Sequence, residues 1–89
     1  MTDYEVIEKL KHHLGATEVY NITRYQAFRH AKDGVFQTVE IEVLDRGPSD
    51  PQTRYHVTAV ADDGRKASGN SGPNLDTVLA TVHWFELDK

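Results

Sequence analysis

The chain lacks cysteine, a basic excess and any long apolar run, and each absence narrows what it can be. With no cysteine among its 89 residues, disulfides and thiolate zinc sites are excluded, which fits a reducing compartment. No apolar segment is long enough to span a bilayer, and none follows the N-terminus as a secretion signal would. The sequence therefore predicts a single cytoplasmic domain over residues 1–89.

The charge balance counts against a dedicated nucleic-acid binder. The net charge is −4, and the acidic residues outnumber the basic ones by eight to five in 1–45 and by six to five in 46–89. Proteins that bind phosphate backbones usually present a basic surface, because their affinity comes largely from displacing counterions. The contents of 38% hydrophobic and 27% charged residues are instead typical of an ordinary folded, soluble domain.

The first residues carry the pattern of an amphipathic helix. Thr2 and Glu5 occupy the positions of a capping box, and Met1 and Val6 occupy those of a hydrophobic staple. Gly15 follows as a left-handed stop. The apolar residues recur at helical spacing: Val6, Ile7, Leu10 and Leu14.

Residues 18–32 allow two interpretations. The segment opens with β-branched and aromatic residues, which favour a strand, and continues with good helix formers. We predict a strand, because the hairpin dipeptide Asp33-Gly34 stands directly before the alternating residues 35–44. The competing interpretation is a helix over 23–32 that Gly34 ends.

The later segments predict more strands and a second helix. Residues 35–44 alternate, so that Val39, Ile41 and Val43 face a core while Glu40 and Glu42 face water. Strands are also expected over 54–61 and 65–68, joined by the turn Asp62-Asp63-Gly64. After a glycine-rich loop, Asn74 caps a helix that runs to Phe85 or Glu86. Its expected core residues are Leu75, Val78, Leu79 and Val82, and Trp84 covers the helix end or the sheet edge.

Together these elements predict an α+β fold. The expected order is α-β(β)ββ-α, a two-layer sandwich in which two helices pack on one face of an antiparallel sheet of three to four strands.

Residues 35–87 also resemble the double-stranded-RNA-binding domain in the order of their turns and elements. The resemblance lies in Gly47-Pro48, in Tyr55, Val57 and Ala59 at alternating positions, in Asp63-Gly64, and in the loop Gly69-Asn70-Ser71-Gly72 before a helix. It implies the α-β-β-β-α fold of that family. The family's second helix opens with a lysine motif that binds phosphates, whereas this chain has Asn74-Leu75-Asp76 there. An acid in the first turn repels phosphate, so we transfer no functional residue.

No catalytic, cofactor or metal site is predicted. The five histidines (His12, His13, His30, His56 and His83) lack the spacing of metal ligands. Ser68 and Ser71 have no nearby partner in sequence, and Asp62 and Asp63 are typical turn formers. A domain this small rarely encloses a pocket of several hundred cubic ångströms, so an enzyme is not expected.

Two functions from different classes remain. We favour a non-catalytic interaction domain that binds a protein or itself through a sheet edge or the Trp84 end. The alternative is a divergent RNA-binding module that uses dispersed cations: Arg24, Arg29, Lys32, Arg54, Arg65 and Lys66. The residues predicted to contact a partner are Arg24, Tyr25, Phe28, Arg29, Lys32, Arg65, Lys66 and Trp84.

Overall fold

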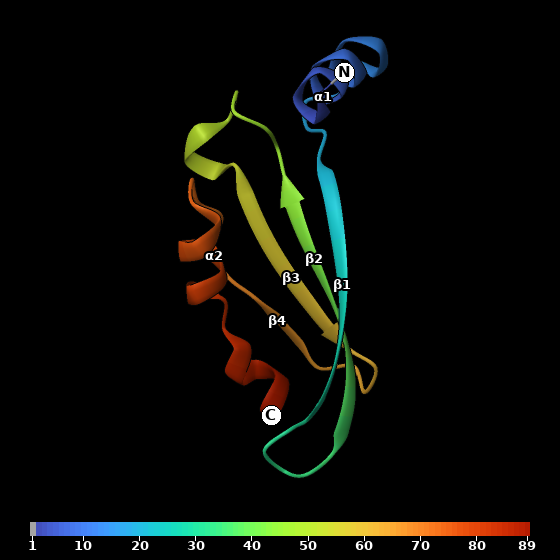
Figure 1. The fold of residues 1–89 in the computed structure, drawn as a ribbon, viewed down its shortest axis with the longest axis vertical. Helices are drawn as coiled ribbons and strands as arrows, with labels where there is room; N and C mark the ends of the chain where they lie inside the picture. Colours follow the sequence, from blue (N-terminus) through green and yellow to red (C-terminus); the bar gives the residue numbers. More distant parts are fainter. Residues whose placement is uncertain (1) are drawn as a thin grey trace.

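The computed structural model describes residues 2–89 and contains two helices and one antiparallel sheet (Figure 1). The helices are α1 (Asp3–Leu14) and α2 (Leu75–Thr81). The strands are β1 (Asn21–His30), β2 (Phe36–Asp45), β3 (Tyr55–Ala61) and β4 (Lys66–Ser68). Two short 3-10 helices complete the chain: η1 (Pro51–Thr53) and η2 (Trp84–Asp88). The predicted α+β fold is confirmed.

The strands form a meander in the order β1-β2-β3-β4, with every neighbouring pair antiparallel. The segment with two interpretations is a strand, as predicted, and pairs with β2 over its whole length. Gly34 and Gly64 lie at the two expected turns with φ of 86° and 92°. Glycine reaches that left-handed region without the steric cost that a Cβ imposes, which explains why each turn ends in Asp-Gly.

Alternation gives the sheet two different faces. The inner face carries the core, with Val39 of β2, Val57 and Ala59 of β3, and Ala67 of β4 all buried. Val78 and Val82 pack onto it from the α2 side, and Leu87 does so from η2. The outer face carries Glu40 and Glu42 and is not covered by either helix (Figure 1).

α1 begins and ends as its sequence predicts. The Thr2 hydroxyl accepts a hydrogen bond from the Glu5 amide at 3.3 Å, and Gly15 closes the helix with φ of 63°. The hydrophobic staple cannot be followed, because Met1 lies outside the described residues. Of the four apolar helix residues only Ile7 is buried, near Gly47 in the loop after β2.

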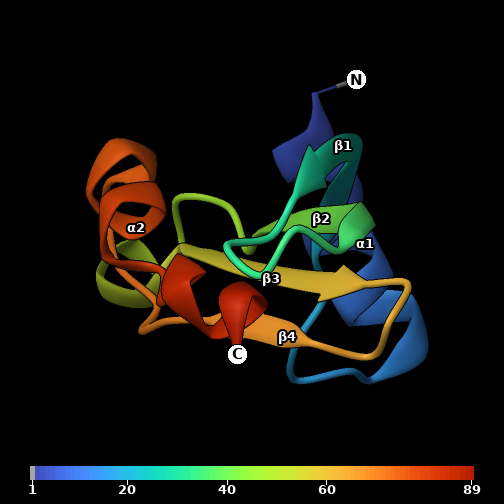
Figure 2. The same cartoon turned by 90° about the horizontal axis from the view of Figure 1, so that it is seen from below.

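The two helices lie apart along the molecule. The sequence placed both on one face of the sheet; α2 lies along the sheet, whereas α1 lies beyond the end where β1 begins (Figure 1). Viewed along the long axis, α1 and α2 lie on opposite sides of the molecule (Figure 2). Contacts to the loop after β2 hold α1 there. One of them places the Arg54 guanidinium carbon 4.7 Å from the centroid of the Tyr4 ring.

The second helix is shorter than predicted. Asn74 caps it, as expected, by accepting a hydrogen bond from the Thr77 amide at 3.2 Å. It ends at Thr81 rather than near Phe85, because Val82 is extended and the Trp84 indole donates a hydrogen bond to the Leu79 carbonyl at 2.9 Å. The chain then forms η2, which lies against β4.

Candidate functional site

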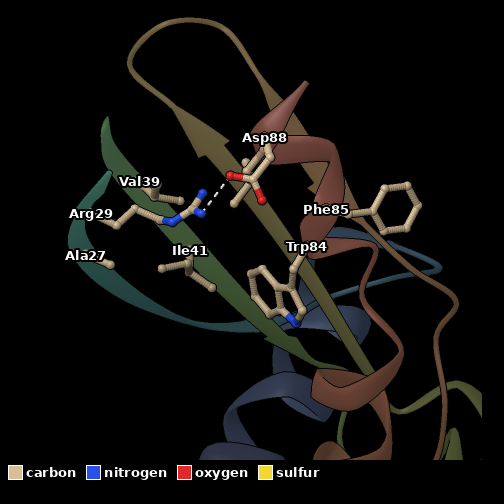
Figure 3. A pocket seen from close by; sticks show the side chains of 8 residues that line it. Ala27, Arg29, Val39, Ile41, Trp84, Phe85 and Asp88 are labelled. Carbon is tan, nitrogen blue, oxygen red and sulfur yellow. Dashed lines mark hydrogen bonds and ion pairs between the residues drawn. The ribbon is translucent and has the colours of Figure 1, made fainter. Parts of the chain in front are cut away.

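An open apolar pocket lies on the inner face, between η2 and the strands β1 and β2 (Figure 3). Its volume is about 430 Å³. Val39 and the buried Leu87 contribute to its lining, as do the half-buried Ile41 and Trp84. Ala27 stands on the outermost strand, on the far side of the pocket from Trp84 (Figure 3). The pocket is larger than a domain of this size led us to expect, because η2 does not cover β1 and the adjoining part of β2.

The pocket exists because the inner face is wider than the elements that cover it. α2 packs over β3 and η2 packs over β4, so their side chains fill the β3–β4 half of the sheet. On β1 the same face carries Tyr25, which is 58% exposed. An apolar surface that the rest of the chain leaves open is the usual sign of a binding site.

A polar network closes one end of the pocket. Arg29 of β1 donates a hydrogen bond to Asp88 of η2 at 2.8 Å and another to the Gln37 side chain at 2.9 Å. Gln37 is fully buried, and its amide nitrogen donates to Asp63 and to the Leu87 carbonyl. Since no buried side-chain polar atom of residues 2–89 lacks a partner, this network is satisfied and fixes η2 against the sheet.

The same network lowers the pKa of three carboxyl groups. The hydrogen bond from Arg29 holds the pKa of Asp88 below its ordinary value of 3.8, helped by the Lys32 amide. The Gln37 hydrogen bond lowers the pKa of Asp63, and the Arg65 guanidinium lowers that of Asp33. All three carboxylates are therefore structural anions that join the hairpin turns to the C-terminal segment.

The residues predicted to contact a partner do not form one surface. Their side chains alternate along β1, so that Tyr25 and Arg29 lie on the inner face while Arg24 and Phe28 lie on the outer face. Trp84 lines the pocket that also includes Arg29. The remaining members lie in the turn after β1 (Lys32), before β4 (Arg65) and on the outer side of β4 (Lys66).

Most of the cations proposed for RNA binding are neutralised within the chain. Arg24 pairs with Glu42 at 2.7 Å and Arg54 with Asp45 at 2.9 Å. Arg29 is held by Asp88, and Arg65 pairs with Asp33 at 2.7 Å. These pairs lie on different faces and at different ends of the sheet, so the cations make no continuous basic stripe.

β1 has a free edge alongside the pocket. The Ala31 amide bonds the Val35 carbonyl at 2.8 Å, and hydrogen bonding alternates along antiparallel strands. Odd-numbered residues of β1 therefore bond β2, and the even-numbered ones direct their amides and carbonyls away from the sheet. In the described chain no strand lies beyond β1. The pocket and a row of unpaired backbone groups thus adjoin one another.

The outer face carries a second apolar feature near the first hairpin. Phe28 and Phe36 stack with ring centroids 6.4 Å apart, and the His30 ring meets the edge of Phe36 at 5.4 Å. Phe28 is 66% exposed. These rings lie on the outer face and do not line the pocket beside η2, which is the better-formed site because it is hollowed and apolar.

One serine–histidine contact lies among residues 2–89. Ser71 lies 3.2 Å from the Nδ1 of His56, which ties the glycine-rich loop to β3. A serine nucleophile needs a base that a third group orients, and no hydrogen bond to the other His56 nitrogen is present in this part of the chain. Over the same residues, no three His, Asp or Glu side chains gather as metal ligands. Neither α1 nor α2 is long and apolar enough to cross a membrane.

No protein-family model, curated protein or solved structure matches the chain. The resemblance to the double-stranded-RNA-binding domain therefore stays a prediction, and function must be argued from the pocket and the strand edge.

Sequence reasoning identified Trp84, Tyr25 and Arg29 but missed the pocket itself. The missed lining residues are Ala27, Val39, Ile41, Phe85, Leu87 and Asp88. Strand alternation could have separated Arg24 from Arg29, because an odd spacing puts two residues of a strand on opposite faces. The sequence pattern did not predict that η2 would leave the inner face next to β1 uncovered.

Proposed function

We propose that this domain is a non-catalytic interaction module that binds protein in the pocket between η2 and the β1–β2 hairpin. The observation that carries the proposal is the pairing of two features: an open apolar pocket and an unpaired ten-residue edge strand beside it. Strand addition combines these two elements, because backbone hydrogen bonds give affinity while pockets for alternate side chains give specificity.

The chemistry of the pocket favours a side chain over a small polar substrate. Its wall is aliphatic and aromatic, and the one ion pair at its end, Arg29 with Asp88, is already satisfied internally. A polar metabolite would have to disturb that pair to gain hydrogen bonds. An aromatic or aliphatic side chain needs only to displace water from Ile41 and Trp84.

Site-specific photo-crosslinking tests the proposal. A benzoylphenylalanine at Phe85, which lines the pocket and is 52% exposed, is compared with one at Val60 on the outer face. In cells that make the full chain, we expect protein crosslinks from position 85 and few from position 60. Equal labelling from the two positions, or none from position 85, contradicts the proposal.

RNA binding is the competing function, and a gel-shift titration against duplex and single-stranded RNA separates the two. Binding by dispersed cations would weaken steeply with salt. We expect no shift at low salt, because Arg24, Arg29, Arg54 and Arg65 are paired with acids on separate surfaces. A salt-sensitive shift that Arg24→Gln abolishes would replace the proposed function with the RNA-binding one.

A further inference from the structure

The geometry points to a second copy of this chain as the occupant of the edge and the pocket. In this dimer two β1 strands pair antiparallel about a two-fold axis at Gln26, and Tyr25 of each copy enters the pocket of the other. This inference rests on the proposed function and names its partner.

The register follows from where a large exposed side chain and a small one lie. Pairing about Gln26 sets Tyr25 of one copy opposite Ala27 of the other, both on the inner face. Directly opposed Cβ atoms across antiparallel strands are about 5 Å apart. Ala27 lines the open side of the pocket and has only a methyl group, so the tyrosine ring passes over it toward Ile41 and Trp84. By two-fold symmetry, the same contact fills the pocket of each copy.

Charge is compatible with this register, and side-chain size disfavours the neighbouring ones. About Gln26, Arg24 faces Phe28 of the second copy, and Arg29 faces Thr23, so no like charges are opposed. A shift of the axis to Ala27 sets Tyr25 opposite Arg29 of the second copy rather than opposite Ala27. A shift to Tyr25 puts Thr23, which cannot fill the pocket, opposite Ala27. The register about Gln26 thus avoids the destabilising opposition of like charges and sets Arg24 beside the Phe28 ring, which is favourable.

The strand itself carries few of the usual protections against pairing. Natural edge strands are kept apart by lysine, proline, bulges or short length. Residues Asn21–His30 contain no lysine and no proline, and their pairing with β2 runs unbroken over ten residues. Their two arginines are each held by an acid of the same chain, so no free cation on β1 selects an acidic partner strand over an identical one.

Sedimentation of the full chain over a wide concentration range is the first test. We expect a reversible monomer–dimer equilibrium, and Tyr25→Ser should weaken it at least about tenfold, as removal of a central interface tyrosine does. Tyr25 is largely exposed in the single chain, so the variant should fold, which far-UV circular dichroism checks. Val60→Ser, an exposed change on β3, is the control and should leave the equilibrium unaltered. A wild-type chain that stays monomeric, or a Tyr25→Ser chain that dimerises as well as wild type, overturns the inference.

Single cysteines test the register, since the natural chain has none. Gln26→Cys sets two thiols at the two-fold axis, where hydrogen-bonded pairs have Cα atoms about 5.5 Å apart, within disulfide range. Phe28→Cys, on the same face and strand, leaves them four residues apart along the strand. We expect rapid disulfide dimers from the first variant and slow ones from the second. The reverse order, or equal rates, overturns the register.

The two proposals fail in different ways. If the chain is monomeric and Gln26→Cys stays reduced while position 85 still crosslinks to another protein, self-pairing is wrong and the interaction function stands. If position 85 crosslinks to nothing as well, both are wrong. Crosslinks from position 85 to β1 peptides of a second copy, found in a species with the mass of a dimer and lost with Tyr25→Ser, support both; crosslinks to β1 within one chain do not count.

Discussion

The chain covers one edge strand of the sheet, β4, and leaves the other, β1, exposed. β4 has three residues, its Ser68 carbonyl accepts a hydrogen bond from the His83 amide at 3.1 Å, and η2 packs alongside. β1 has ten residues, and Asn21, at its start, donates a hydrogen bond to Asp3 of α1. One edge is closed by the C-terminal segment, and the other is left open beside an apolar pocket.

The close packing of the chain is concentrated around β4, α2 and η2. Gly69, directly after β4, lies very close to the end of α2. A Cβ at this position would lie 2.9 Å from the Thr81 carbonyl oxygen. The buried Leu87 fixes the end of η2 in the same half of the sheet. Folded proteins usually suppress exposed strand edges, because such edges promote aggregation. We therefore infer that the long edge of β1, left open beside a pocket, serves the binding proposed above.

Substitutions at the closed edge should lower the free energy of unfolding more than substitutions at the open edge. Leu87→Ala should have the largest effect. Leu87 is 3% exposed, so its truncation removes core contacts and should lower the free energy of unfolding by about 3 kcal/mol. The neighbouring Phe85→Ala removes a half-exposed ring and should cost less than about 1 kcal/mol. Urea unfolding followed by circular dichroism measures both. Equal losses would mean that η2 does not close this edge.

Gly69→Ala tests the close approach between β4 and α2. Its Cβ would contact backbone atoms of Thr81 and Val82, which cannot rotate away, so we expect a loss of about 2 kcal/mol. Asn70→Ala, an exposed change in the same loop, should stay within about 0.5 kcal/mol of wild type. The comparison uses urea midpoints at unchanged m-value. A neutral Gly69→Ala would show that the loop is free to move from α2.

Amide hydrogen exchange sharpens the comparison along β1 itself. In dilute protein the amides of Arg24, Gln26 and Phe28 should exchange much faster than those of Tyr25 and Ala27, which bond β2. At concentrations where dimers form, the first three should become protected. Amides that alternate in the opposite sense would contradict the pairing of β1 with β2, and unchanged exchange at high concentration would leave the edge unpaired.

Much of the fold could be predicted because its signals are local. Val39, Ile41 and Val43 alternate, Asp33-Gly34 marks a turn, and Asn74 caps a helix, each within a few residues. The end of α2 was predicted several residues too late. Its position depends on the Trp84 indole bonding the Leu79 carbonyl and on the His83 amide bonding β4, which are tertiary contacts.

The site was predictable only in fragments. The pocket joins residues 27–41 to residues 84–88, and its closing ion pair links Arg29 to Asp88, which are 59 positions apart in the chain. Clustering of rings and cations drew attention to Tyr25 and Arg29, yet the same signal grouped them with Arg24 and Phe28 of the other face. Composition indicates which side chains suit a contact, and topology decides which of them share a surface.

Acid should weaken the hydrogen bonds that Asp88 of η2 accepts from Arg29 and Lys32 at the open side of the sheet, and this effect is the smallest we expect. The pKa of Asp88 is lowered in the folded chain by Arg29, so its contribution to stability is present above the unfolded value of 3.8. That contribution is lost as pH falls through the lower folded pKa. Asp33 and Asp63 act in the same sense. Stability should therefore hold near neutral pH and decline below about pH 4.

Asp88→Asn isolates the contribution of this link. The variant should be less stable than wild type at neutral pH, and the gap should narrow as acid protonates Asp88 in the wild type. Fluorescence of Trp84, the single tryptophan and a neighbour of Asp88 in the pocket lining, reports unfolding across a urea series at each pH. Asp76→Asn, an exposed change in α2 with no ion pair among residues 2–89, controls for the loss of one negative charge. If the gap between Asp88→Asn and wild type stays constant down to low pH, the Arg29–Asp88 pair does not hold η2 to β1, and the open side of the sheet depends on apolar contacts alone.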